Sequence, residues 1–159
     1  MNKTYLLLGS NIGESKMLLE KACVRINEAI GKVIHSSHLY STKAWGNTQQ
    51  PDFLNQVIVV ETILTATQTL ANALAIEQQM GRTRKIKNEP RIIDIDILLF
   101  GREIIHTQDL IIPHPALHLR RFVLVPLNEI APRLVHPVLK KNIRQLLQAC
   151  PDKLGVNKI

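Results

Sequence analysis

Two aspartates lie inside an otherwise apolar stretch, residues 90–100, which reads PRIIDIDILLF. Asp94 and Asp96 are two residues apart, so on a β-strand both side chains face the same side of the sheet. Adjacent carboxylates repel each other, and a bound divalent cation removes that repulsion. Mg²⁺ prefers oxygen ligands and is often held by one or two carboxylates together with substrate phosphates. The spacing predicts a magnesium site; a solvated strand face that carries two acids is the alternative.

A cluster of positive charge directly precedes these aspartates. Arginine binds phosphate through two parallel hydrogen bonds, and a loop with several cations can fold over phosphate groups. Metal ions on phosphate oxygens and arginines on the developing charge are the parts of a phosphoryl-transfer site. A run of charges that is simply solvated is the alternative explanation. The five cationic residues are Arg82, Arg84, Lys85, Lys87 and Arg91.

The excess positive charge of the chain lies entirely in its second half. Up to Gly81 there are six Lys and Arg residues and six Asp and Glu residues; from Arg82 onward there are fourteen and seven, and the formal net charge is +7. This asymmetry favours a polyanionic ligand, which can be nucleic acid or a nucleotide polyphosphate. Solubility alone is the less specific explanation.

Three further polar residues near this pattern are candidates for contacts with a ligand. Glu77 falls in the last turn of a predicted helix, close to the basic loop, where an ordinary exposed acid is equally consistent. His114 lies between two prolines that restrict its backbone, which suits a positioned phosphate donor. Arg120 is followed by Arg121, and we expect at least one of the two to be solvated.

The first half of the chain carries residues suited to a flat heteroaromatic ligand. Phe53 and Asn55 are two apart on a predicted strand and share a face. Asparagine offers a donor and an acceptor to a ring edge, and phenylalanine offers a stacking surface. Trp45 is the only tryptophan and falls in a polar loop. Each of these residues taken alone also fits an ordinary core or turn position.

The hydrophobic pattern predicts the elements that position these residues. Their order is β-α-β-β-α-β, followed by C-terminal helices, in one domain that spans residues 1–159. This order indicates an α+β, ferredoxin-like fold: an antiparallel sheet with helices on one face plus C-terminal extra elements. The predicted strands cover 4–11, 32–42, 53–63 and 91–100, and the first of them runs into a turn at residues 9–11. The predicted helices cover 14–30, 65–80, 123–131 and 142–150.

Several classes of protein are disfavoured by the composition. No apolar run reaches the length of about 18 residues that a membrane span needs. The N-terminal stretch lacks the apolar region and cleavage site of a signal peptide. Cys23 and Cys150 are far apart and show no metal-ligand spacing, so we expect reduced thiols. We therefore expect a cytoplasmic protein without a membrane partner.

Five segments of the chain together carry a family resemblance: LLLGSNIG, QPDFLNQVIVVET, IEQQMGRTRK, PRIIDIDILLF and IPHPALHLRRFVLVPLNEIAP. In this order they resemble 6-hydroxymethyl-7,8-dihydropterin pyrophosphokinases of the folate pathway. The resemblance implies a ferredoxin-like enzyme that transfers the β,γ-pyrophosphate of ATP to the pterin hydroxymethyl group and releases AMP, with ATP and the pterin as partners. We also expect no nucleic-acid partner and a monomer.

The resemblance also implies roles for residues at matching positions. Asp94 and Asp96 match the ligands of two Mg²⁺ ions, and Asp96 is also a candidate to accept the proton of the attacking hydroxyl. Arg82 and Arg91 match catalytic arginines that grip the phosphates. The positions that match ATP contacts are Glu77, Arg84, Ile97, His114 and Arg120. The positions that match the pterin pocket are Thr42, Trp45, Phe53, Asn55 and Phe122.

Two other functions fit parts of the pattern. The basic second half is compatible with an RNA-binding module on the same fold, but such modules stack bases on sheet aromatics, and aromatic residues make up only 4% of this chain. A nucleotidyltransferase also uses paired aspartates, and it releases pyrophosphate rather than AMP. The products of ATP turnover separate these alternatives.

Overall fold

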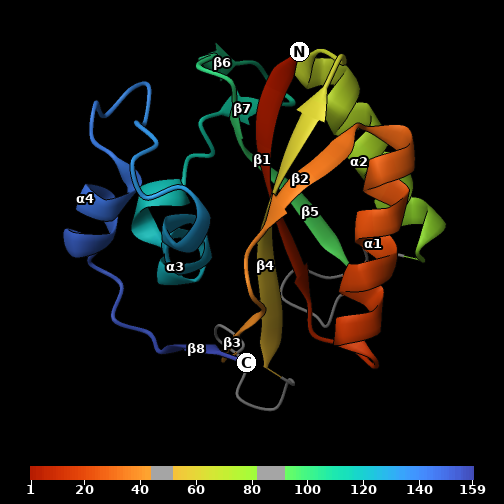
Figure 1. Ribbon diagram of the computed structural model, residues 1–159, viewed down its shortest axis with the longest axis horizontal. Helices are drawn as coiled ribbons and strands as arrows, with labels where there is room; N and C mark the ends of the chain where they lie inside the picture. The colour runs from red at the N-terminus through yellow and green to blue at the C-terminus, as the bar shows by residue number, and fades with distance from the viewer. Residues whose placement is uncertain (44–51, 82–91) are drawn as a thin grey trace.

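The computed structural model describes residues 1–43, 52–81 and 92–159. Within these residues, six strands form one antiparallel sheet and two short strands form a second sheet (Figure 1). The elements are β1 (Asn2–Ser10), α1 (Ser15–Ala29), β2 (Lys32–Ser36), β3 (Tyr40–Thr42), β4 (Phe53–Thr62), α2 (Ala66–Gln79), β5 (Asp94–Phe100), β6 (Ile105–His106), β7 (Ile111–Ile112), a 3-10 turn (Leu117–Leu119), α3 (Arg121–Ile130), α4 (Ile143–Gln148) and β8 (Val156–Lys158).

The main sheet has the strand order β5-β1-β4-β3-β8, and β2 also pairs with β4. The predicted ferredoxin-like β-α-β-β-α-β arrangement is confirmed, with β2 and β3 in the place of its second strand. The prediction of one continuous strand over 32–42 is wrong. The Ser37 hydroxyl accepts a hydrogen bond from the Val57 N–H, so a side chain replaces a backbone partner where the strand is interrupted. The C-terminal strand β8, which the sequence pattern did not predict, extends the sheet beyond β3.

Helices cover both faces of this sheet. Figure 1 shows α1 and α2 on one side and α3 and α4 on the other. Leu6 and Leu8 of β1 belong to the core under α1 and α2, whereas Leu7 belongs to the core under α3 and α4. The expectation of helices on one face holds for α1 and α2. The apolar C-terminal helices cover the second face, so the sheet lies between two layers of helices (Figure 1).

The strand that carries the two aspartates alternates as predicted at its start. Ile95 and Ile97 are buried under α1 and α2, while Leu98 belongs to the opposite core. Asp94 and Asp96 share the face of Leu98. A bulge against β1 then places Leu98 and Leu99 in the same core. The apolar face of β5 thus anchors the strand and leaves its aspartates on the side of α3.

The ends of α2 follow from local sequence signals. Thr65 accepts a hydrogen bond from the Gln68 N–H, and the Gln68 side chain accepts one from the Thr65 N–H. At the other end, Gly81 has a φ of +88°, a conformation that L side chains rarely adopt. Both predicted boundaries, the Thr65 cap and the Gly81 stop, are confirmed.

A polar link joins α3 to the edge of the sheet. Glu129 accepts hydrogen bonds from the Tyr40 hydroxyl and the His38 N–H, and its Oε2 lies 2.8 Å from the His38 Nδ1. Partial burial raises the pKa of Glu129, but the hydrogen bonds from Tyr40 and His38 outweigh burial, so this pKa is lowered. Burial, together with Glu129, raises the pKa of Tyr40 to about 12. The Glu129 carboxylate therefore stabilises the fold in its ionised form.

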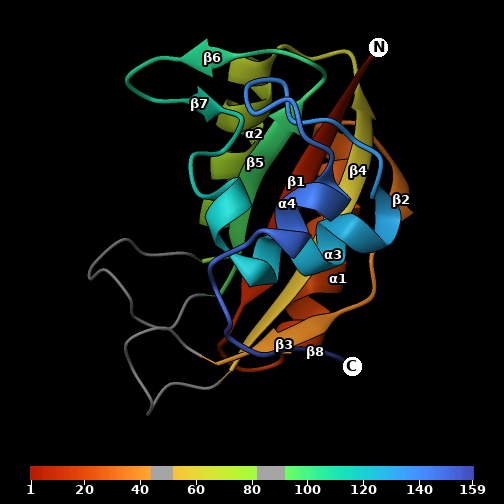
Figure 2. The ribbon, with the colours of Figure 1, turned by 90° about the vertical axis from the view of Figure 1, so that its left-hand side faces the viewer.

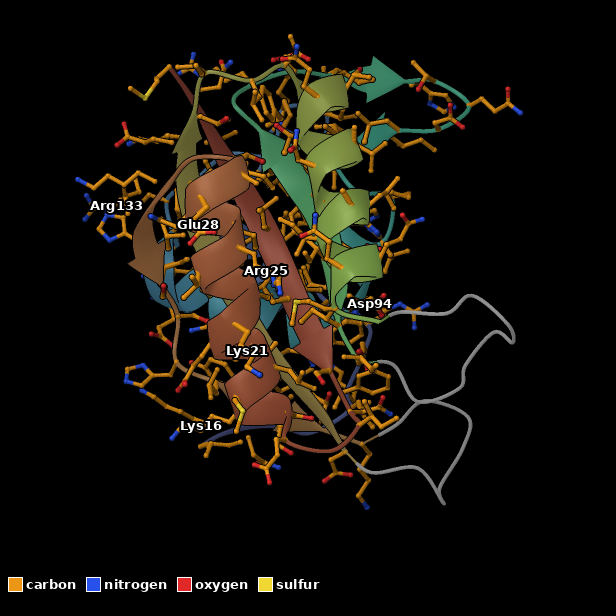
Figure 3. The ribbon with its side chains drawn as sticks, turned by 90° about the vertical axis from the view of Figure 1, so that its right-hand side faces the viewer. Lys16, Lys21, Arg25, Glu28, Asp94 and Arg133 are labelled. Carbon is orange, nitrogen blue, oxygen red and sulfur yellow. The ribbon has the colours of Figure 1, made fainter. Side chains whose placement is uncertain are left out.

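We expect the Glu129→Gln variant to be less stable than the parent at neutral pH, with a difference that narrows on acidification. A group whose folded-state pKa is lowered stabilises the fold above its unfolded pKa and loses this contribution as pH falls through the folded pKa. Urea unfolding at pH 7 and near pH 3 measures the difference, with Glu28→Gln on the exposed face of α1 as the control (Figure 3). An equal difference at both pH values would contradict this account.

No helix in the described ranges is both long and apolar enough to cross a membrane.

Candidate active site

A cavity of about 480 Å³ lies on the sheet face that α3 covers. Its walls come from β1, β3, β4 and β5, from the segment that enters α3, from the first turn of α3, and from the segment that leads to β8. Figure 2 shows α3 and α4 in front of β1 and β4. The lining residues are Leu7, Gly9, Thr42, Lys43, Phe53, Asn55, Asp94, Asp96, Leu98, His114, Ala116, Arg120, Phe122, Val123, Asp152 and Leu154.

The two aspartates mark one end of this cavity, on the edge strand β5. Asp94 is half-buried and Asp96 is exposed, so the two carboxylates combine a fixed backbone with access to solvent. Figure 3 shows Asp94 close to the C-terminal end of α2. Paired carboxylate oxygens fit Mg²⁺. Across residues 1–43, 52–81 and 92–159, no group of three or more His, Cys, Asp or Glu side chains is placed to hold a metal. Two carboxylates leave ligand positions that phosphate oxygens and water can fill.

Glu77 supports the strand that carries these aspartates. Its side chain is 3% exposed, so the alternative of an ordinary exposed helix acid is wrong. Its Oε2 accepts a hydrogen bond of 2.7 Å from the N–H of Ile95, the residue between the two aspartates. A buried charge-assisted hydrogen bond of this length fixes the start of β5 against α2. Glu77 is not among the residues that line the cavity.

Replacing Glu77 by alanine is expected to reduce the free energy of unfolding by about 1–3 kcal/mol, because the buried Ile95 N–H loses its acceptor. The Glu77→Gln variant keeps an acceptor at this place, so it should lose less. Urea denaturation of both variants measures the difference. Equal stability of Glu77→Ala and the parent protein would show that this hydrogen bond does not hold β5.

His114 and Arg120 line the cavity from the segment that enters α3. The Nδ1 of His114 accepts a hydrogen bond from the Ala116 N–H, so a neutral ring carries its hydrogen on Nε2. Burial lowers the pKa of His114, and the nearby Arg120 lowers it further. At neutral pH this imidazole is an uncharged hydrogen-bond donor, beside a guanidinium that is always charged.

The cavity wall over β3 and β4 is suited to a flat polar ring. Asn55 is 4% exposed, and its Nδ2 donates a hydrogen bond to the Thr42 Oγ1. Gly9 lies opposite Asn55 in the β1–β4 register, and a Cβ at Gly9 would come within 2.9 Å of the Asn55 Oδ1. Phe53 and Phe122 line the same cavity. A fixed amide flanked by two aromatic side chains can bind the edge and faces of a heteroaromatic ring.

Most described residues that the sequence singled out meet in this one cavity. Ile97 does not line it: its side chain is 5% exposed and packs in the core under α1 and α2. Four predicted residues, Trp45, Arg82, Arg84 and Arg91, lie outside the described residues. The predicted residues that line the cavity are Thr42, Phe53, Asn55, Asp94, Asp96, His114, Arg120 and Phe122.

Sequence reasoning missed several parts of the wall. The sequence predicts a turn at Gly9, yet this residue belongs to β1 and leaves space for the Asn55 side chain. Asp152 and Leu154 lie far along the chain from the other lining residues, in a segment without a hydrophobic period. The Asp-x-Leu spacing carries no signal that distinguishes it from an ordinary loop.

The comparison with protein families gives one match over most of the chain. The family model described as 7,8-dihydro-6-hydroxymethylpterin-pyrophosphokinase (HPPK) matches residues 5–132.

Curated proteins and a solved structure are similar over nearly the whole chain. Two of them are named 2-amino-4-hydroxy-6-hydroxymethyldihydropteridine pyrophosphokinase. The protein from Aquifex aeolicus is 39% identical over 145 residues, which cover 91% of this chain and 90% of the relative. The protein from Methylorubrum extorquens is 38% identical over 160 residues, which cover 100% of this chain and 99% of the relative. The Plasmodium falciparum HPPK-DHPS structure with pteroate superposes with a TM-score of 0.76 at 20% identity, over 93% of this chain and 42% of that one. This structural likeness supports the fold alone.

Proposed function

Since the chain belongs to the 7,8-dihydro-6-hydroxymethylpterin-pyrophosphokinase family, we propose that it transfers the β,γ-pyrophosphate of ATP to the hydroxymethyl group of 6-hydroxymethyl-7,8-dihydropterin. The chain is an ATP-dependent diphosphotransferase of folate biosynthesis, and AMP is the second product. One observation supports the assignment of this reaction to the cavity. A carboxylate pair suited to Mg–ATP and a buried amide suited to a pterin edge line the same space of about 480 Å³.

We assign the phosphate end of the reaction to β5 and the segment before α3. Asp94 and Asp96 would hold two Mg²⁺ ions together with the phosphates of ATP. When bound, these ions neutralise charge on the phosphate oxygens. His114 offers its Nε2–H and Arg120 its guanidinium to the same phosphates. The exposed Asp96 carboxylate is the candidate to accept the proton of the attacking hydroxyl.

We assign the pterin end to β3, β4 and the start of α3. Asn55 presents its amide to the ring edge, and Thr42 holds that amide in place through the 3.2 Å hydrogen bond. Phe53 and Phe122 provide apolar surfaces for the ring. Holding the hydroxymethyl group next to the phosphates lowers the entropic cost of the reaction.

The remaining predicted contacts stay proposals of the same kind. Trp45 is proposed for the pterin pocket, Arg82 and Arg91 for catalysis and Arg84 for ATP, all outside the described residues. Glu77 and Ile97 were also predicted to contact ATP. The structure supports an indirect role for both, because each holds the strand that bears the aspartates. We further propose that the chain works as one domain, as a monomer, in the cytoplasm, without nucleic acid or membrane.

An assay with ATP, Mg²⁺ and 6-hydroxymethyl-7,8-dihydropterin tests the function. The nucleotide products and pyrophosphate are separated, and parallel reactions omit the pterin or the metal. We expect AMP only when both are present. Release of pyrophosphate would instead indicate nucleotidyl transfer, and RNA binding without ATP turnover would indicate the RNA-binding alternative.

A further inference from the structure

The cavity has a wall that the matched family region does not include. Asp152 and Leu154 line it, whereas the family match ends at residue 132. Leu154 is half-buried, so part of its side chain is available to a ligand. The question is which part of a bound substrate this wall would meet.

The segment that bears this wall is held at two points. Its strand β8 pairs with β3, with Val156 opposite Thr42. Asp152 anchors the other end: its Oδ2 accepts a hydrogen bond of 3.0 Å from the Arg121 N–H, and its Oδ1 accepts one of 2.9 Å from the Leu154 N–H. Arg121 is the first residue of α3, so a carboxylate also lies at the positive end of that helix dipole. One side chain thus fixes Leu154 relative to α3.

The strand order then decides which end of the cavity this wall closes. The aspartates lie on β5, and the sheet continues through β1 and β4 to β3 and β8. With neighbouring strands about 4.8 Å apart, β3 lies about 14 Å from β5. A pterin whose hydroxymethyl group faces phosphates at Asp94 and Asp96 extends across β1 and β4. Its pyrimidine ring, which bears the 2-amino group, therefore ends at β3, beside Leu154.

We propose that Leu154, held by Asp152, closes the pyrimidine end of the pterin site and limits the size of the substituent that the 2-amino group can carry. This inference rests on the proposed function, since the direction of the pterin follows from the transfer reaction. Leu154 is a specificity-determining residue in this account, and Asp152 is a positioning residue. An apolar wall discriminates one added methyl group by about 10- to 200-fold.

The test compares 6-hydroxymethyl-7,8-dihydropterin with its N2-methyl derivative as acceptors. For each, kcat/KM is measured with the parent protein and with Leu154→Ala, Asp152→Ala and Leu154→Phe. The matched control is Asn157→Ala, because Asn157 is an exposed β8 residue one position out of phase with Val156. The equilibrium affinity of each pterin, in the presence of a non-hydrolysable Mg–ATP analogue, is measured in parallel.

We expect Leu154→Ala to lower the preference for the unmethylated pterin by about ten-fold, because a wall of this kind supplies discrimination of that size. Asp152→Ala should also lower this preference, and Leu154→Phe should raise it. In every variant the KM for ATP should stay close to the parent value. In Asn157→Ala the preference for the unmethylated pterin should also stay close to that of the parent. An unchanged preference in both Leu154 variants, in turnover and in affinity, would overturn the proposal. Absence of AMP from the parent protein would refute the proposed function instead, and the pterin affinities would still decide whether Leu154 limits the site.

Discussion

The Asp96→Ala variant is expected to lose about 10³-fold or more in turnover. The carboxylate lines the cavity from a strand whose opposite face is core, so its position is fixed before substrate binds. Under the proposed assignment, its removal takes away one Mg²⁺ ligand and leaves the phosphate charge less compensated. The side chain is exposed, so the variant should fold as the parent does. Steady-state rates over a range of Mg²⁺ concentrations measure the effect.

The control for this variant is Glu103→Ala. Glu103 is an exposed acid between β5 and β6 and does not line the cavity, so its removal changes the net charge equally. We expect its turnover to match that of the parent. Near-normal turnover in Asp96→Ala, or an equal loss of turnover in both variants, would contradict the assignment of Asp96 as a Mg²⁺ ligand.

The Asn55→Ala variant is expected to lose at least about 100-fold in kcat/KM for the dihydropterin. Its side chain is 4% exposed and its Nδ2 donates a hydrogen bond to the Thr42 Oγ1, so the amide is fixed in place before a ligand binds. A site built to bind a polar ring edge loses much of its affinity when its own polar partner is removed. Initial rates with each substrate varied in turn measure the effect, and the KM for ATP should change little.

Two further variants show whether the loss comes from this amide. Asn72→Ala removes a half-buried asparagine of α2 that does not line the cavity, and it should leave the rates unchanged. Gly9→Ala places a Cβ 2.9 Å from the Asn55 Oδ1, so it should raise the KM for the pterin without removing any polar group. If the KM for ATP rises as much as the KM for the pterin in Asn55→Ala, the assignment of Asn55 to the pterin site is contradicted.

Much of this fold follows from local sequence signals. The alternation of Asp94 to Ile97, the cap at Thr65 and the left-handed Gly81 each depend on a few neighbouring residues, and each was predictable. The break between β2 and β3 was not, because it depends on a hydrogen bond from Val57 to the Ser37 side chain, twenty residues away.

The candidate site likewise has residues that the sequence predicts and residues that it does not. Asp94, Asp96 and Asn55 carry signals of type and spacing, and the sheet brings them into one cavity. Glu77 looked equally like a surface acid, because its burial depends on where β5 packs. The role of Asp152 depends on a contact with Arg121, thirty-one residues away in the chain. Pairwise contacts of this kind leave no period or motif in a single sequence.

The phosphorus NMR spectrum of the pterin product tests the central claim most directly. The parent protein is incubated with ATP, Mg²⁺ and 6-hydroxymethyl-7,8-dihydropterin, and Asp96→Ala is followed in parallel. We predict a pterin that carries two phosphorus atoms coupled to each other, formed in equal amount with AMP and nearly absent with Asp96→Ala. A pterin with one phosphorus atom and ADP, or equal formation of the product by Asp96→Ala, would contradict pyrophosphoryl transfer at this carboxylate pair.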